Sequence, residues 1–142
     1  MGEQPDLGAA ERPGRAESAG LIYHIARADD WARAEAASRY AGSALCRADG
    51  FIHFSSPHQV AGTLGRFFAG ADGLVLLAAE AAALGDGLKW ERAPDGAIYP
   101  HYYGVLAVGR LRMLGPITRD GAGGHVIPVA LGDAADPAGE GP

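Results

Sequence analysis

Cysteine is nearly absent from this 142-residue chain, which contains one, Cys46. A single cysteine cannot form an intrachain disulfide, so nothing in the composition points to secretion into an oxidising compartment. No base stands beside Cys46 in the sequence. A buried, inert thiol is therefore the expected role of Cys46 and is favoured over a nucleophile.

Basic charge is also scarce. Lysine and arginine together number 12, against 17 aspartates and glutamates, and the formal net charge is −5. The basic residues are scattered along the chain. This distribution argues against an extended nucleic-acid-binding surface, while a local pocket for one phosphate stays compatible with it.

Long apolar runs are missing as well. The longest, LVLLAA at residues 74–79, suits a buried strand and is far too short to cross a bilayer. The first residues do not combine a basic segment with an apolar run, as a secretory signal peptide would. We therefore expect a cytoplasmic protein without membrane contact.

Large apolar side chains are rare at both ends. Residues 1–19 and 119–142 consist mostly of small, polar and proline residues, which bury too little apolar surface to offset the entropy of ordering. We predict that both are disordered tails around one domain at residues 20–118. Within the second tail, only residues 125–129 are apolar enough to dock as a short extra strand.

The middle of the chain alternates strand and helix signals. Strands are expected at 21–25, 51–55, 74–79, 88–91 and 105–113. A helix is expected after a cap at Asp29 or Asp30, with Gly42 as its stop, and a short helical turn at 81–84. This order predicts an α+β fold with a strongly curved, mainly antiparallel sheet and two packed helices.

The second predicted helix has the strongest local signal. Ser56 stands at an N-cap position, Pro57 at the first helical position, and Gln59 completes a capping box. Gly70 is the expected end. The helix carries an apolar stripe made of Val60, Leu64, Phe67 and Phe68.

A candidate ligand site lies just before that helix. Side chains alternate across a strand, so Phe51, His53 and Ser55 should share one face while Ile52 and Phe54 enter the core. A helix N-terminus also attracts anions such as phosphate. Capping is the favoured role of Ser56, whereas capping and ligand contact stay equally open for Ser55.

Three further residues could carry chemistry. His24 lies in the first strand, where a histidine is often only a structural hydrogen-bonding residue. Glu91 could pair with Arg92 at the surface or serve as a general base. His101 precedes two tyrosines, in an aromatic-rich loop suited to holding a flat ring, and could equally anchor that loop.

A metal site is an alternative use of the same residues. His24, His53, His101 and Glu91 together would suit zinc or iron. None of them shows a close ligand spacing such as H-x-H or HExxH. The sequence therefore predicts no metal.

Several motifs resemble one family. The chain is similar to the bacterial domain-of-unknown-function 952 (DUF952) family over about residues 21 to 117. The matching features are IYHI at 22–25, Trp31, GFIHFS at 50–55, Gln59-Val60, RFF at 66–68, the 74–77 strand, LKWE at 88–91 and PHYYG at 100–104.

This resemblance implies likeness in fold to ADP-ribosyltransferases, which bind NAD in a cleft of a split, curved sheet. Carried over, His24 matches a first-strand residue that holds the nicotinamide ribose or phosphate side. His53 with Ser55 matches a second-strand position. Glu91 matches a glutamate that binds the ribose hydroxyl and stabilises an oxocarbenium-like transition state. His101 has no counterpart there.

The leading hypothesis is thus an ADP-ribosyltransferase-like enzyme that binds NAD or a related nucleotide. Its catalytic residues would be His53, Glu91, His24 and His101, and its cofactor-binding residues His24, Ser55, Ser56 and Tyr103. One alternative is another small-molecule enzyme that uses the same histidines and glutamate for acid–base chemistry. A second is a non-catalytic ligand-binding module. The oligomeric state is left open.

Overall fold

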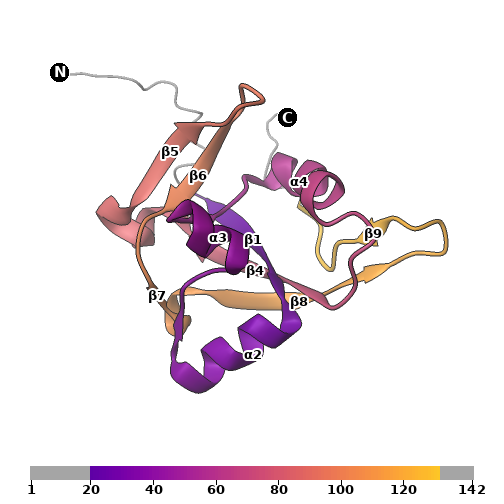
Figure 1. Ribbon diagram of the computed structural model, residues 1–142, viewed down its shortest axis with the longest axis horizontal. Coiled ribbons are helices and arrows are strands. Elements are labelled where there is room, and N and C mark those ends of the chain that lie inside the picture. The colour runs from indigo at the N-terminus through magenta and orange to yellow at the C-terminus, as the bar shows by residue number, and fades with distance from the viewer. Residues whose placement is uncertain (1–19, 132–142) are drawn as a thin grey trace.

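A computed structural model describes residues 20–131. The predicted tail at 1–19 and the last part of the predicted tail at 119–142, residues 132–142, lie outside these described residues. Figure 1 shows the arrangement of the elements. In chain order they are β1 (Leu21–Arg27), α2 (Ala28–Ala37), β2 (Arg39–Tyr40), α3 (Ala44–Asp49), β3 (Ile52–His53), η1 (Pro57–Gln59), α4 (Val60–Phe67), β4 (Leu74–Glu80), η2 (Ala81–Gly87), β5 (Leu88–Arg92), β6 (Ile98–Tyr102), β7 (Leu106–Ala107), η3 (Val108–Arg110), β8 (Arg112–Arg119) and β9 (His125–Val126).

Strand β4 lies at the centre of the main sheet, whose order is β1-β4-β8-β9. Every β4 residue before Glu80 is buried. Both faces of β4 are covered, which explains why it reads as an unbroken apolar run. A β-bulge interrupts the β4–β8 pairing between Leu76 and Leu77, and Gly115 opposite it has a φ of 146°.

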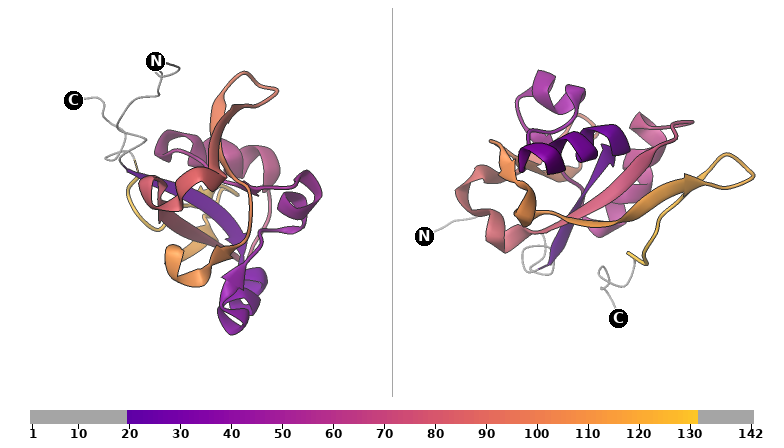
Figure 2. Two further views of the ribbon diagram at one scale, coloured as in Figure 1. Left: turned by 90° about the vertical axis from the view of Figure 1, so that its left-hand side faces the viewer. Right: turned by 90° about the horizontal axis from the view of Figure 1, so that it is seen from below.

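Two smaller sheets accompany the main one, with orders β2-β7 and β3-β6-β5, and all strand pairs are antiparallel. The predicted α+β class with antiparallel sheets is confirmed, and the main sheet is curled (Figure 2). The β5–β6 and β8–β9 hairpins project from the body of the fold (Figures 1 and 2).

The core has two halves on opposite faces of the main sheet. Ile22 and Leu77 face one half with Trp31 of α2, whereas Tyr23 and Leu76 face the other, which Val60 and Leu64 of α4 also enter. Neighbouring residues on one strand thus enter different halves, as side-chain alternation requires.

Helix α2 differs from prediction at both ends. Arg27 takes the N-cap position and makes no side-chain cap, while Asp29 and Asp30 lie in the first turn, where their charge favours the helix N-terminus. The helix ends at Ser38, in the left-handed region with a φ of 66°, and does not continue to Gly42. The cap at Asp29 or Asp30 and the Gly42 stop were therefore wrong.

Helix α3 was not predicted. Its six residues are too few to show a helical period in the sequence. Ser43 caps it by accepting a hydrogen bond from the Cys46 amide at 3.2 Å. Gly50 closes it with a φ of 91°.

The capping box before α4 is present, although its first turn, η1, is a 3₁₀ helix. The Ser56 amide donates to Gln59 Oε1 at 2.9 Å. Of the predicted apolar stripe, Val60 and Leu64 are buried, but Phe67 is 58% exposed. The helix ends with its C-cap at Phe68, before the expected Gly70.

The last predicted strand, residues 105–113, was wrong as one element. It is divided into β7, the 3₁₀ turn η3 and the start of β8. The fold continues past residue 118: β8 runs to Arg119, β9 pairs with it, and Leu131 is buried in the core. β9 lies within residues 125–129, the stretch expected to dock as an extra strand. No helix among residues 20–131 is long and apolar enough to cross a membrane.

Candidate functional site

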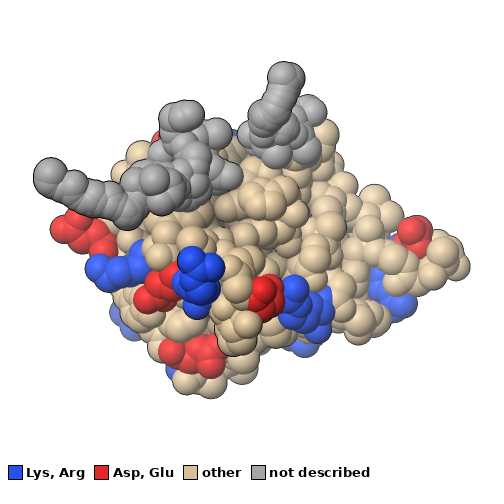
Figure 3. All heavy atoms as spheres, turned by 90° about the horizontal axis from the view of Figure 1, so that it is seen from above, with Lys and Arg blue, Asp and Glu red and all other residues tan. Residues whose placement is uncertain are grey.

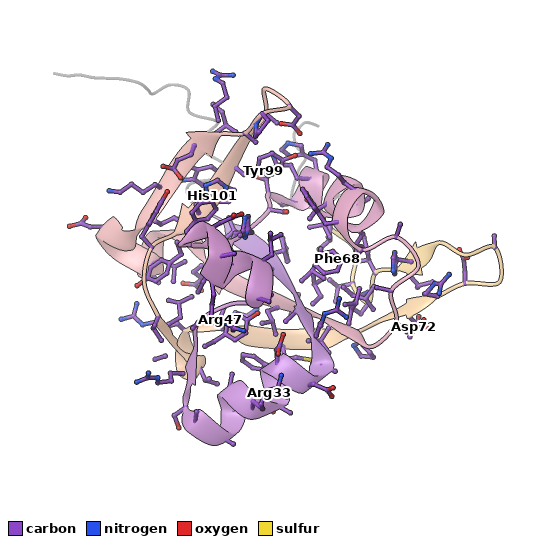
Figure 4. All side chains as sticks on the ribbon, viewed as in Figure 1. Arg33, Arg47, Phe68, Asp72, Tyr99 and His101 are labelled. Atoms are coloured by element: carbon purple, nitrogen blue, oxygen red, sulfur yellow. The ribbon has the colours of Figure 1, made fainter. Side chains whose placement is uncertain are left out.

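A cavity of about 810 Å³ opens between α3, β3, α4 and the β5–β6 hairpin. Of the seven predicted site residues, it gathers His24, His53, Ser55, Glu91 and His101 in its wall. Ser56 and Tyr103 do not line it. Figure 4 shows Tyr99 and His101 on β6, on the side of that strand where α3 and α4 lie.

His24 lines the cavity but is only 3% exposed. Its Nδ1 lies 2.6 Å from the His53 carbonyl oxygen, and its Nε2 lies 2.6 Å from the Tyr40 hydroxyl. A carbonyl only accepts, so Nδ1–H donates to it and Nε2 accepts from Tyr40. Burial lowers the pKa of His24 to about 4. His24 is therefore neutral at pH 7 and anchors the backbone of His53.

His53 links two side chains of α3. Its Nε2 lies 2.9 Å from Asp49 Oδ2, and its Nδ1 lies 3.1 Å from Cys46 Sγ. Burial alone lowers the pKa of His53, but the hydrogen bonds and charges of Cys46 and Asp49 outweigh it and raise that pKa above its ordinary value. His53 is thus biased toward the imidazolium form.

Cys46 is buried, as predicted, but the absence of a neighbouring base was wrong. The turn between α3 and β3 returns the chain so that His53, seven residues later, meets the sulfur. Burial raises the pKa of the Cys46 thiol, and hydrogen bonds from His53 and Ser43 outweigh that effect and lower it. Asp49, which was not predicted as a site residue, bonds to the other nitrogen of the His53 ring. Its position three residues after Cys46 was the available signal, once α3 is known to be a helix.

His101 and Glu91 form a second histidine–carboxylate pair. His101 lies in strand β6, and its predicted place in a loop was wrong. Its Nδ1 donates to Glu91 Oε1 at 2.7 Å, and the Tyr103 hydroxyl donates to the same oxygen at 2.7 Å. Among the described residues, Nε2 of His101 has no hydrogen-bond partner. Phe51 stacks on the imidazole with ring centroids 4.0 Å apart.

The His53–Asp49 and His101–Glu91 pairs differ in the protonation state that each favours for its histidine. Hydrogen bonds from His101 and then Tyr103 lower the pKa of Glu91, so this carboxylate is ionised. Burial lowers the pKa of His101; Glu91 opposes this effect, and the charge of His53 adds to it. The rings of His53 and His101 meet edge to face with centroids 5.7 Å apart. A neutral His101 therefore lies beside an imidazole that tends toward the cation.

The two serines have mainly structural contacts. Ser55 exchanges two backbone hydrogen bonds with Tyr23, at 2.8 and 2.7 Å, and its hydroxyl lies 3.0 Å from that of Thr63. Ser56 is 2% exposed, and its amide is occupied by Gln59. The anion site expected at this helix N-terminus has lost one of its donors to the capping box.

The mouth of the cavity combines an ion pair with apolar side chains. Arg66 of α4 pairs with Asp95, in the turn of the β5–β6 hairpin, at 2.7 Å, and the Tyr99 hydroxyl donates to the same carboxylate at 3.0 Å. Leu45 and Phe67 stand at 46% and 58% exposure in the cavity wall.

On the molecular face in Figure 3, acidic and basic side chains are interspersed. No single-sign patch forms among the described residues of that face.

No group of three or more histidine, cysteine or acidic side chains in residues 20–131 is arranged to hold a metal ion. In the four-residue set considered from the sequence, His24 cannot join, because its ring nitrogens bond to His53 and Tyr40.

Comparison with known proteins identifies the family. Residues 25–112 match the family described as "Protein of unknown function (DUF952)". The chain belongs to the DUF952 family. No curated protein matches the sequence.

DUF952 relatives include protein CC0527 from Caulobacter crescentus. Its crystal structure is 42% identical, with a TM-score of 0.71, and the match covers 80% of this chain and 96% of that one. Its solution NMR structure is also 42% identical, with a TM-score of 0.67 and coverage of 82% and 97%. This chain therefore shares the fold of CC0527 over nearly all of that protein.

Proposed function

We propose that the cavity is the active site of a small-molecule enzyme, in which His101 acts as general base and Glu91 orients it. The observation that supports this most is the direction of the His101 ring. Nδ1–H is directed to Glu91 at 2.7 Å, so the lone pair of the neutral ring is on Nε2, the nitrogen without a partner among the described residues.

The neighbouring charges suit that role. A general base must be unprotonated, and both burial and the charge of His53 lower the pKa of His101. The raised pKa of His53 leaves a positive charge near the place where negative charge would develop. Two imidazoles with pKa values displaced in opposite directions are typical of an acid–base site.

The walls favour a ligand with a flat, largely apolar part. Phe51 and His101 form a stacked aromatic surface, and an 810 Å³ cavity accepts a molecule of drug size. Three carboxylates line the cavity, Asp49, Glu91 and Asp95, against two arginines, Arg66 and Arg92. Both arginines already have partners, Asp95 and the Gly96 carbonyl.

A second candidate is the ADP-ribosyltransferase-like reaction on NAD. It is supported by the Glu91 carboxylate in the cavity wall, whose Oε2 has no partner among the described residues. This oxygen could accept a ribose hydroxyl and stabilise an oxocarbenium-like transition state. Nicotinamide would stack on Phe51 or His101. The diphosphate of NAD has no unpaired cation among the described residues of the cavity wall. Arg66 or Arg92 would have to leave its present partner to bind it.

Turnover of three probes tests both candidates: bis(p-nitrophenyl) phosphate, p-nitrophenyl glycosides and NAD. Wild type should be compared with His101→Gln, Glu91→Gln and the exposed control His58→Gln. We expect His101→Gln to slow the productive probe at least about 100-fold. Nicotinamide release that disappears in Glu91→Gln would favour the NAD reaction. Binding without turnover would indicate a recognition module, and equal rates in wild type and His101→Gln would exclude His101 as the base.

A further inference from the structure

Cys46, His53 and Asp49 form a nucleophile–base–carboxylate series beside the cavity. The sulfur lies 3.1 Å from Nδ1 of His53, and Nε2 of the same ring lies 2.9 Å from Asp49 Oδ2. A nucleophile within hydrogen-bond reach of a base, with a third group orienting that base, is the arrangement used for covalent catalysis. All three residues line the 810 Å³ cavity.

We propose that Cys46 is the nucleophile of a covalent acyl-transfer step in this cavity, with His53 as its proton carrier and Asp49 as a positioning residue. The substrate class is an ester or thioester with an apolar acyl group. This inference uses residues other than the His101–Glu91 pair and does not rest on the function proposed above.

Local structure fixes the direction of the sulfur. Gly42 packs so closely against Cys46 that a Cβ on residue 42 would lie 2.5 Å from the Cys46 Cβ. The Ser43 hydroxyl holds the Cys46 amide, and the His53 amide donates to Sγ at 3.4 Å. Asp49, three residues after Cys46, shares its helix face. The cysteine side chain is therefore held toward the imidazole.

His53 is fixed from the opposite side. His24 donates to the His53 carbonyl at 2.6 Å, which anchors the backbone of β3 beneath the ring. Phe51 packs against the His53 ring with centroids 4.6 Å apart. Cys46 belongs to the buried hydrophobic core, but its sulfur also meets both the ring and the amide of His53, which an inert core thiol would not need.

The walls beyond the sulfur suit an apolar acyl group. Leu45 precedes the cysteine and Phe67 stands on α4, and both expose much of their side chains at the cavity. Phe54 and Phe68 add further apolar lining. A short aliphatic chain or an aryl ring would bury this surface.

The chemical step balances without a cofactor. The Cys46 thiolate attacks the carbonyl carbon, a C–S bond forms, and the bond to the leaving oxygen or sulfur breaks. The leaving alcohol or thiol takes its proton from the His53 imidazolium. Water then attacks the thioester and gives a proton back to His53, releasing the carboxylic acid and restoring the thiolate.

Stopped-flow hydrolysis of p-nitrophenyl butyrate tests the proposal. We expect a burst of one p-nitrophenol per protein and a butyryl adduct on Cys46 in the mass of the trapped protein. Cys46→Ser should lose both. His53→Gln should slow the burst about 100-fold or more and Asp49→Asn about 10- to 100-fold. His58→Gln, an exposed histidine outside the cavity wall, should behave as wild type.

A second measurement, alkylation of wild-type Cys46 by N-ethylmaleimide as a function of pH, tests the proposal even if a variant does not fold. In wild type, alkylation at pH 6 should exceed that of glutathione, and Asp49→Asn should move the profile toward the ordinary thiol pKa. A burst with a Cys46 adduct supports the proposal. Absence of an adduct, or alkylation that follows an unperturbed thiol, overturns it and leaves the His101 hypothesis standing.

Discussion

The His24 imidazole is enclosed as a neutral ring with both nitrogens bonded, and its pKa is about 4 against the ordinary value of 6.5. Between these two values the unfolded chain binds a proton that the folded protein does not. Lowering the pH therefore favours unfolding. The contribution of His24 to the free energy of unfolding is fully present above pH 6.5 and is lost progressively toward pH 4. The shift corresponds to about 3 kcal/mol.

His24→Gln should remove this part of the pH dependence. It should also cost about 1–3 kcal/mol at pH 7, because the carbonyl of His53 and the hydroxyl of Tyr40 lose well-placed partners. Urea denaturation of both proteins from pH 4 to 7 measures the difference. A wild-type curve that parallels that of the variant would contradict a buried, neutral His24.

Glu91 opposes the lowering of the His101 pKa through its hydrogen bond and its charge. Glu91→Gln should therefore lower the pKa of His101 further, and release the Tyr103 hydroxyl from its carboxylate partner. NMR titration of the His101 ring protons measures the shift. Glu35→Gln, on the exposed face of α2, is the matched control. An unchanged titration of His101 would show that the pair does not form.

Some individual site residues were accessible from the sequence and others were not. Alternation along residues 51–55 predicted the burial of Ile52 and Phe54, and His53 and Ser55 line the cavity, although Phe54 lines it too. The partners of His53 were hidden, because they depend on an unrecognised six-residue helix and the turn after it. The pairing of Glu91 with His101 was also hidden, since it requires the register of β5 on β6.

At the scale of elements, the α3 segment depends on two glycines with positive φ but different surroundings. Gly42 has a φ of 92° and packs against Cys46 and Ile52, whereas Gly50 has a φ of 91° and a Cβ placed there would meet nothing within 4 Å. Gly42→Ala should destabilise the protein by about 2–4 kcal/mol, through both backbone strain and steric overlap.

Gly50→Ala introduces only the strain of a positive φ at a residue with a Cβ. It should lower the free energy of unfolding by about 1–2 kcal/mol. The difference between the two variants in urea denaturation isolates the overlap with Cys46. Equal losses would show that the cysteine can move aside, which would also weaken the fixed sulfur direction on which the covalent proposal relies.

Three of the strands were predicted closely. β1, β4 and β5 were anticipated within one or two residues because burial on one or both faces imposes a pattern over several positions. The strand expected at 105–113 failed because that range contains the two-residue β7, the 3₁₀ turn η3 and only the start of β8, and none of these pieces is long enough to show a pattern. Phe67 was misassigned because the stripe on α4 continues to the cavity, where an apolar residue can remain exposed.

For the whole molecule, the Arg66–Asp95 pair joins α4 to the turn of the β5–β6 hairpin across the cavity mouth. Both groups are exposed to solvent, so Arg66→Met should change the melting temperature little. Amide exchange in residues 93–97 should accelerate, while exchange in β4 stays slow. Arg33→Met removes the comparable pair with Asp30 and should leave residues 93–97 unchanged. Unaltered exchange in the hairpin turn would show that the pair does not restrain it.

The fold class was predictable because the order of elements restricts it, whereas the separation into three sheets was not. That separation depends on contacts distant in sequence, such as β3 with β6 and β2 with β7. The same distant contacts assemble the cavity. Some members of the site were therefore predictable from the sequence, whereas their partners, such as Asp49 for His53, were not.

The paired backbone bonds between Tyr23 and Ser55 connect the main sheet to the three-stranded sheet through an isolated bridge. The hydrogen bond from His24 to the His53 carbonyl adds a second link between β1 and the segment after α3. These few bonds therefore set the position of the β3 wall of the cavity relative to the main sheet. The Cys46–His53 contact, by contrast, is set locally by the turn between α3 and β3.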